Sequence, residues 1–114
     1  MTDEAPAPAD PLSAANITAF LQDYHRQVLT DPRAAYARTG PTLRANISED
    51  NYVGYWSDFS DVRLSDIQAV DGRNTATAVM ELVYASGTSE TGPHEFTFIV
   101  GDGGQLILDS DFAV

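Results

Sequence analysis

The spacing of apolar residues changes along the chain from a helical period to a strand period. Up to about residue 60, apolar side chains recur three, four and seven positions apart, as on one face of a helix. From Val62 onward they alternate with polar side chains, as in a half-buried strand. Helices followed by a run of strands predict an α+β domain, in which helices cover one face of an antiparallel sheet.

Three helices are predicted in the first part of the chain. Ser13 can cap the first, and one apolar stripe follows it, made of Ile17, Phe20, Leu21, Tyr24 and Val28. A short second helix begins at Asp31-Pro32 and ends near Arg38, before the sequence TGP. Ser48 can cap the third helix.

The third helix carries four aromatic side chains, Tyr52, Tyr55, Trp56 and Phe59. They are spaced as i, i+3, i+4 and i+7, which is the spacing of a single buried face. Two roles are open for this face. It packs in the core between helix and sheet, or it also turns tyrosine hydroxyls into a cavity.

Four strands are predicted after the helices. They are Val62–Val70, Thr75–Ala85, His94–Val100 and Gln105–Ser110, separated by glycine-containing turns. Alternation assigns one face to the core, and its residues are Met80, Phe96, Phe98, Leu106 and Leu108. The opposite face is more apolar than a solvated surface requires, with Val79, Val83, Ile99 and Ile107. The outer face of the sheet is therefore predicted to be partly covered, and a homodimer contact through the sheet is one explanation.

Composition and charge exclude several classes of function. The chain has 114 residues, the size of one domain, and a net charge of −11 from 17 acidic and 6 basic residues. Such a surface repels nucleic-acid backbones and anionic membranes, so neither is predicted as a partner. The absence of cysteine excludes thiol catalysis and thiolate metal sites. No apolar run is long enough to span a bilayer.

The first eleven residues differ from the rest of the sequence. Residues 1–11, MTDEAPAPADP, combine alanine and proline with acids and have no apolar period. This composition predicts an extended, solvated linker, followed by a domain over residues 12–114. Such a leader favours a domain tethered to an anchor or to another domain.

Four stretches carry a resemblance to a known family. They are YWSDFSDVRLSDIQAV from Tyr55, TATAVMELVY from Thr75, HEFTFIV from His94 and GDGGQLILDS from Gly101. They resemble nuclear transport factor 2-like domains, and most closely small actinobacterial domains that lie outside the membrane, attached to Ser/Thr kinases or lipoproteins. Leu106 stands where those relatives usually have tryptophan. The resemblance implies that the sheet curves as a cone around the three helices.

A cone of this kind leaves a cavity between its helices and the concave side of the sheet. The side chains predicted to line a ligand pocket there are Tyr24, Tyr36, Tyr52, Tyr55, Trp56, Met80, Phe96 and Phe98. No metal site and no cofactor are predicted. The two histidines are 69 positions apart, and no turn has the acid pattern of a calcium loop.

No catalytic residue is predicted either. Steroid isomerases and polyketide cyclases, which belong to the resembled family, use a pocket carboxylate and a tyrosine or protonated acid. The groups usable in this way are Tyr24, His25, Tyr36, Tyr55, His94 and Asp109, and none falls in a motif of those enzymes. Tyr24 and His25 lie about 100° apart on a helix, so both are not expected to point inward. His94 is expected at a rim, and Asp109 and Asp111 in solvent or a turn.

These observations lead to one principal prediction and two alternatives. The principal one is a non-catalytic binding or sensor module on the extracytoplasmic side of a bacterial membrane, which binds a small apolar ligand or a protein partner. The first alternative is a small enzyme, an isomerase, cyclase or hydrolase, that acts on an apolar substrate. The second is a structural dimerisation domain.

Overall fold

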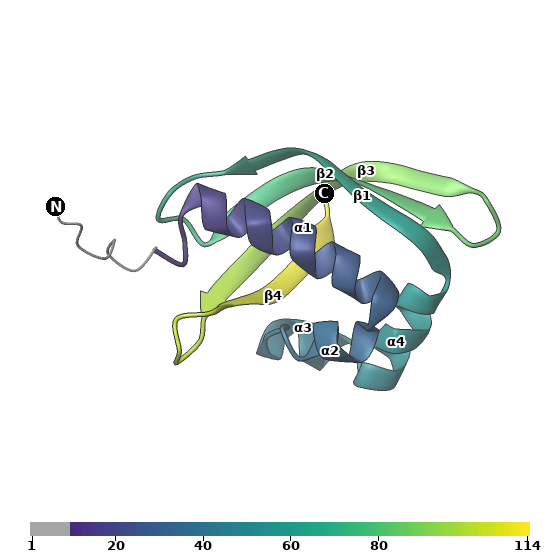
Figure 1. Ribbon diagram of the computed structural model, residues 1–114, viewed down its shortest axis with the longest axis horizontal. Helices are drawn as coiled ribbons and strands as arrows, with labels where there is room; N and C mark the ends of the chain where they lie inside the picture. The colour runs from purple at the N-terminus through teal and green to yellow at the C-terminus, as the bar shows by residue number, and fades with distance from the viewer. Residues whose placement is uncertain (1–9) are drawn as a thin grey trace, which may run out of the picture.

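A four-stranded antiparallel sheet curves over one long helix (Figure 1). The computed structural model describes residues 10–114. The strands pair in chain order and are β1 (Phe59–Ala69), β2 (Thr75–Tyr84), β3 (Ser89–Val100) and β4 (Leu106–Ala113). The long helix is α1 (Ala14–Thr30), and three shorter helices lie together near its C-terminal half (Figure 1). The predicted α+β class with an antiparallel four-stranded sheet is confirmed.

Local capping signals explain where three of the helices begin. The Ser13 hydroxyl accepts a hydrogen bond from the Asn16 amide at the start of α1, as predicted. Asp31 caps α2 (Pro32–Tyr36), which ends two residues before the predicted boundary. Ser48 caps α4 (Glu49–Ser57), also as predicted. Phe59 does not belong to this helix, because it is already the first residue of β1.

Among residues 10–114 there are four helices rather than the three predicted. The additional helix is α3 (Pro41–Asn46), which begins at the last residue of the TGP sequence, in a segment for which no element was predicted. Its N-cap residue, Gly40, has no side chain to cap it. The cap comes instead from Asp109 on β4, whose carboxylate accepts hydrogen bonds from the Thr42 amide at 2.9 Å and the Thr42 hydroxyl at 2.7 Å. A capping residue 67 positions away leaves no local signal in the sequence.

Strand β3 begins five residues before the predicted start, because Gly92-Pro93 is part of the strand and not a turn. Pro93 pairs with Val79 of β2, and its carbonyl accepts a hydrogen bond from Val114. In an antiparallel strand the amide and carbonyl of one residue point to the same side. The missing N–H of Pro93 therefore faces the end of β4, where the loss of a ladder hydrogen bond is tolerated.

The core lies between the sheet and α1, with α2 and α4 closing one end. The five side chains assigned to the inner sheet face are all buried, which confirms that assignment: Met80, Phe96, Phe98, Leu106 and Leu108. On the outer face Val79, Val83 and Ile107 are half-buried, while Ile99 is 36% exposed. A homodimer through this face stays a prediction.

A β-bulge in β4 changes which side chains face the core. Leu108 pairs with Phe98 and Ser110 pairs with Thr97, so Asp109 is one extra residue on β4. Beyond it, Asp111 pairs with Phe96, whose side chain is fully buried on the concave face. Asp111 therefore lies on the concave side of the sheet, where unbroken alternation from Leu108 would have turned it outward.

The start of the domain is fixed to the β1–β2 turn. The Ala14 amide donates to the Asp71 carboxylate at 2.7 Å, and the Gly72 amide donates to the Leu12 carbonyl at 2.9 Å. The predicted linker, residues 1–11, falls outside the described residues except for Asp10 and Pro11. Within residues 10–114, no helix is both long enough and apolar enough to cross a membrane.

Candidate functional site

A pocket of about 200 Å³ opens where α1, α3 and α4 meet strands β3 and β4. We call it the aromatic pocket, and its lining consists of Tyr24, Leu43, Ile47, Tyr52, Tyr55, Trp56, His94 and Asp111. If each non-hydrogen atom is given the ~30 Å³ that a water molecule occupies in the liquid, this space holds about seven of them. Phe96 and Phe98 do not line this pocket and are almost completely buried. The site therefore suits a small molecule and is too small for a polycyclic one.

Two buried tyrosines form the inner wall of the aromatic pocket. The hydroxyl oxygens of Tyr24 on α1 and Tyr52 on α4 lie 2.5 Å apart and share a hydrogen bond. Burial raises the pKa of Tyr52 to about 12 and, together with the neighbouring Tyr52 hydroxyl, holds the pKa of Tyr24 well above its usual value. Both phenols are therefore neutral at physiological pH and serve as hydrogen-bonding groups.

Two consecutive aromatic residues of α4 form another wall. Trp56 is buried, whereas Tyr55 is 45% exposed and lies at the rim. Their rings are perpendicular, with centroids 5.2 Å apart. The four aromatics predicted to share one buried face of the third helix therefore do not do so. Tyr55 is turned about 100° from Trp56 on the helix, which brings it to the edge of the core.

An ion pair across two strands supplies the charge in the aromatic pocket. His94 Nδ1 on β3 and Asp111 Oδ1 on β4 are 2.7 Å apart, and both side chains are less than 20% exposed. The hydrogen bond that His94 donates to the Asp111 carboxylate raises the pKa of His94 above its usual value, against the opposing effect of partial burial. The Asp111 carboxylate also raises the pKa values of Tyr24 and Tyr55, where burial is the larger cause.

A second histidine, His25, lies beside Tyr24 and Trp56. His25 is buried, and its Nδ1 lies 2.7 Å from the Leu21 carbonyl, which can only accept, so Nδ1 carries the proton. Its Nε2 is buried without a hydrogen-bond partner among the described residues. Burial lowers the pKa of His25, so the ring is neutral at pH 7. The expectation that Tyr24 and His25 would not both point inward was wrong, because α1 is enclosed on two sides, by the sheet and by α4.

The structure divides the eight predicted pocket residues into two groups of four. Tyr24, Tyr52, Tyr55 and Trp56 line the aromatic pocket. The others do not, and they are Tyr36, Met80, Phe96 and Phe98. The Tyr36 hydroxyl donates to the Ile47 carbonyl at 2.9 Å, and its ring packs against Tyr52. The remaining three are buried core residues, and Phe98 and Phe96 pack against Phe20 and His25 of α1.

The two polar residues of the aromatic pocket were not among the predicted lining. His94 was expected at a rim with backbone or water as its partner, and Asp111 in solvent or a turn. Both expectations were wrong, since each is the hydrogen-bond partner of the other. His94 and Asp111 belong to neighbouring strands, and the bulge at Asp109 sets their common face. Only the alternation of His94 with Phe96 and Phe98 could have indicated an inward histidine.

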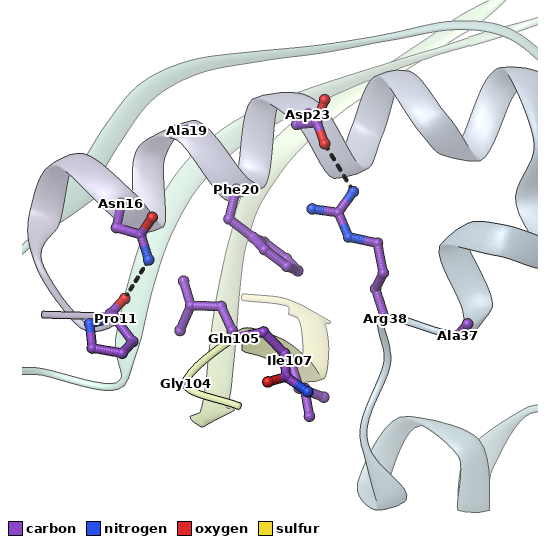
Figure 2. A pocket seen from close by; sticks show the side chains of 11 residues that line it. Pro11, Asn16, Ala19, Phe20, Asp23, Ala37, Arg38, Gly104, Gln105 and Ile107 are labelled. Atoms are coloured by element: carbon purple, nitrogen blue, oxygen red, sulfur yellow. Dashed lines mark hydrogen bonds and ion pairs between the residues drawn. The ribbon is translucent and has the colours of Figure 1, made fainter. Parts of the chain in front are cut away.

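A larger hollow of about 690 Å³ lies between α1 and the β3–β4 turn (Figure 2). Its two charged side chains bind each other, with Arg38 Nη1 3.0 Å from Asp23 Oδ2. The Arg38 guanidinium also lies over the Phe20 ring, 4.6 Å from its centroid. Because these groups already satisfy one another, this hollow offers a ligand little chemistry. The smaller aromatic pocket is therefore the candidate site.

Metal chemistry has no evident ligand set in the part of the chain that the structure describes. No group of three or more histidine or acidic side chains comes close enough to hold an ion among residues 10–114. His94 and Asp111 form a pair, and the adjoining positions in the aromatic pocket are tyrosines and apolar side chains.

Two solved structures share this fold. RPA3114, a SEC-C motif containing protein from Rhodopseudomonas palustris, superposes with a TM-score of 0.64 and 17% identity over 90% of this chain and 81% of that one. A SEC-C motif containing protein from Psychrobacter arcticus superposes with a TM-score of 0.62 and 7% identity, over 96% of this chain and 65% of that one. No protein-family model and no curated protein matches the sequence.

These structures correct the family resemblance drawn from the sequence. The neighbours are SEC-C motif containing proteins and not nuclear transport factor 2-like domains, so the predicted membership was wrong. The quoted stretches, beginning at Tyr55, Thr75, His94 and Gly101, describe amphipathic strands and turns that suit many α+β domains. At 17% and 7% identity the likeness shows the fold alone, and the function has to be argued from the site.

Proposed function

We propose that the protein is a binding module for a small molecule and that the aromatic pocket is its binding site. The observation that carries this proposal is the composition of the pocket. Four aromatic side chains surround a space for about seven non-hydrogen atoms, and a histidine–aspartate pair stands at one side. Ligand sites typically combine an apolar lining with a few oriented polar groups.

The proposal includes the shape of the enclosure. The curved sheet and the helices act as a cone, and the aromatic pocket opens where α3 and α4 approach β3 and β4. Leu43 and Ile47 line that opening from the α3 side. A ligand of the proposed size would contact Trp56 and the Tyr24–Tyr52 hydroxyl pair at its inner end, and Tyr55 at its outer end.

The His94–Asp111 pair favours a second candidate function, acid–base catalysis on a small substrate. An aspartate on Nδ1 orients an imidazole and raises its basicity, which suits a general base. The tyrosine hydroxyls could then stabilise a developing oxyanion. This candidate predicts turnover of a small carbonyl compound or ester that is lost in His94→Gln and retained in Glu95→Gln. Equal rates in both variants would exclude it.

Binding can be tested with neutral probes of the right size. We expect phenol, benzyl alcohol or cyclohexanol to shift the backbone amide NMR signals of Leu43, Ile47 and Asp111 in a saturable way. Tyr55→Ala, which removes an aromatic wall at the exposed rim, should weaken the effect. Absence of saturable shifts with every small probe, neutral or charged, would contradict the proposal, as would shifts confined to the hollow around Arg38.

An extracytoplasmic location stays a prediction from the Ala/Pro leader, residues 1–11, because the family resemblance that supported it was wrong. The same holds for a tethered arrangement and for a protein partner. Fractionation of the native host, with an antibody against this domain, would test the location directly. Recovery with the soluble cytoplasmic fraction would contradict it.

A further inference from the structure

We propose that the ligand of the aromatic pocket is a small organic cation, of the alkylammonium class, held between aromatic rings and the Asp111 carboxylate. This inference rests on the proposed function and specifies its ligand. It follows from the charge of the lining, from the residue types in it and from its size.

The charge of the aromatic pocket is suited to a cation. The lining of the aromatic pocket contains one acidic residue, Asp111, and no lysine or arginine. Arg38 acts on the Tyr24 hydroxyl from outside the pocket, but its guanidinium is bound to Asp23. The net charge of −11 adds a long-range field that attracts cations and repels anions.

The aromatic lining supplies the second requirement. Alkylammonium groups bind in cages of tryptophan and tyrosine, because the electron-rich ring faces attract the charge while the methyl groups need little hydration. Trp56, Tyr55, Tyr52 and Tyr24 form such a set around one space. When His94 is neutral, a neutral apolar ligand would use the rings but would leave the Asp111 carboxylate partly desolvated without a compensating charge.

The volume of the aromatic pocket limits the size of the cation that it can enclose. About 200 Å³ accommodates about seven non-hydrogen atoms, counted at the ~30 Å³ of one water molecule. That number fits a trimethylammonium group with a short hydroxyalkyl arm, which the paired Tyr24 and Tyr52 hydroxyls can bind. Larger cations would extend past Tyr55 into solvent.

His94 makes cation binding dependent on pH. A protonated His94 compensates the Asp111 charge, whereas a neutral His94 leaves it available. The other titratable groups around the pair are Tyr24 and His25 from α1, and Tyr52 and Tyr55 from α4. The pKa values of the three tyrosines are raised and that of His25 is lowered, so all four stay neutral between pH 7 and pH 9. Affinity for a cation should therefore rise with pH as His94 loses its proton.

The test compares two ligands of the same shape by calorimetric titration of the full chain at low ionic strength. Choline carries the charge, and 3,3-dimethyl-1-butanol is its neutral isostere. At pH 9 we expect choline to bind about tenfold more tightly, from cation–π and ion-pair attraction together. The preference should shrink at pH 6. Equal affinities at pH 9, or tighter binding of the neutral alcohol, would overturn the inference.

Matched variants assign the effect to Asp111. Asp111→Asn should abolish the preference for choline. Glu95→Gln should keep it: this variant also removes one negative charge, but Glu95 is exposed on the opposite face of β3. Loss of the preference in both variants would overturn the role of Asp111. Binding of phenol or cyclohexanol without binding of choline would contradict the inference and leave the proposed function standing. Failure of every probe would contradict both.

Discussion

Tyr24 and Tyr52 join α1 to α4 through a hydrogen bond between two buried hydroxyls, 2.5 Å apart. In each single Tyr→Phe variant the remaining hydroxyl loses this partner inside the core. We expect each variant to lower the free energy of unfolding by roughly 1–3 kcal/mol, the usual cost of a buried group left unpaired. The double variant should cost less than the sum of the two. Urea denaturation of the four proteins measures this coupling.

The control for this cycle is Tyr84→Phe. The Tyr84 hydroxyl donates to the Glu90 carboxylate in an exposed position, so its removal should leave the denaturation midpoint nearly unchanged. Strict additivity of Tyr24→Phe and Tyr52→Phe would show that the two hydroxyls are not energetically linked.

The His94–Asp111 pair should be visible in the titration of His94. Because Asp111 raises the pKa of His94, Asp111→Asn should bring that pKa back toward its ordinary value of about 6.5. The stabilisation from a raised histidine pKa is complete below about pH 6.5 and is lost as pH rises through the folded-state pKa. The stability difference between wild type and Asp111→Asn should therefore shrink between pH 6 and pH 9. NMR of the imidazole C–H signals gives the pKa, with Glu95→Gln as the control.

His25 should have the opposite effect on stability. Burial lowers the pKa of His25, so below about pH 6.5 the unfolded chain binds a proton at His25 more readily than the folded chain does. Stability is then lost as pH falls from about 6.5 through the folded-state pKa of His25, by up to about 1.4 kcal/mol per pH unit. His25→Phe removes this proton and should flatten the acid side of the stability profile, whatever its absolute stability. An unchanged slope between pH 6.5 and pH 5 would contradict this.

Gly40 and Gly54 are expected to respond in opposite ways to the same substitution. A Cβ on Gly40 would press against the Asp109 carboxylate and lie 3.2 Å from the Asp109 Cα, so Gly40→Ala should cost roughly 1–3 kcal/mol through overpacking. Gly54 lies exposed within α4 and has nothing within 4 Å of that position. Gly54→Ala should therefore stabilise the helix by about 0.5–1 kcal/mol. Thermal unfolding of both variants checks the contrast.

The parts of the fold that sequence could predict are those with local causes. Ser13 and Ser48 cap their helices through side chains three residues from the amides they bind, and alternation in β2 gives its inner face directly. α3 and the start of β3 were missed because their causes are distant. Helix α3 is capped by Asp109 from β4. Strand β3 can include Pro93 because β4 has ended beside it, so no ladder partner needs the missing N–H.

The candidate site shows the same division. The helical periodicity brought Tyr52 and Trp56 together, and both line the aromatic pocket. The periodicity gave no sign of Asp111, because the position of this carboxylate depends on strand register and on one extra residue in β4. Residues within one element were accessible to pattern analysis, whereas pairs between elements were not.

The extra residue in β4 bears on two separate features of the fold. Asp109, set out of the ladder by the bulge, holds the first turn of α3, while the same displacement turns Asp111 toward His94. Deleting the Asp109 codon would remove the cap of α3 but leave Asp111 on the concave side, because Asp111 would then stand two positions after the inward Leu108 and still pair with Phe96. Shortening β4 by this one residue should therefore separate the helix cap from the charge of the site.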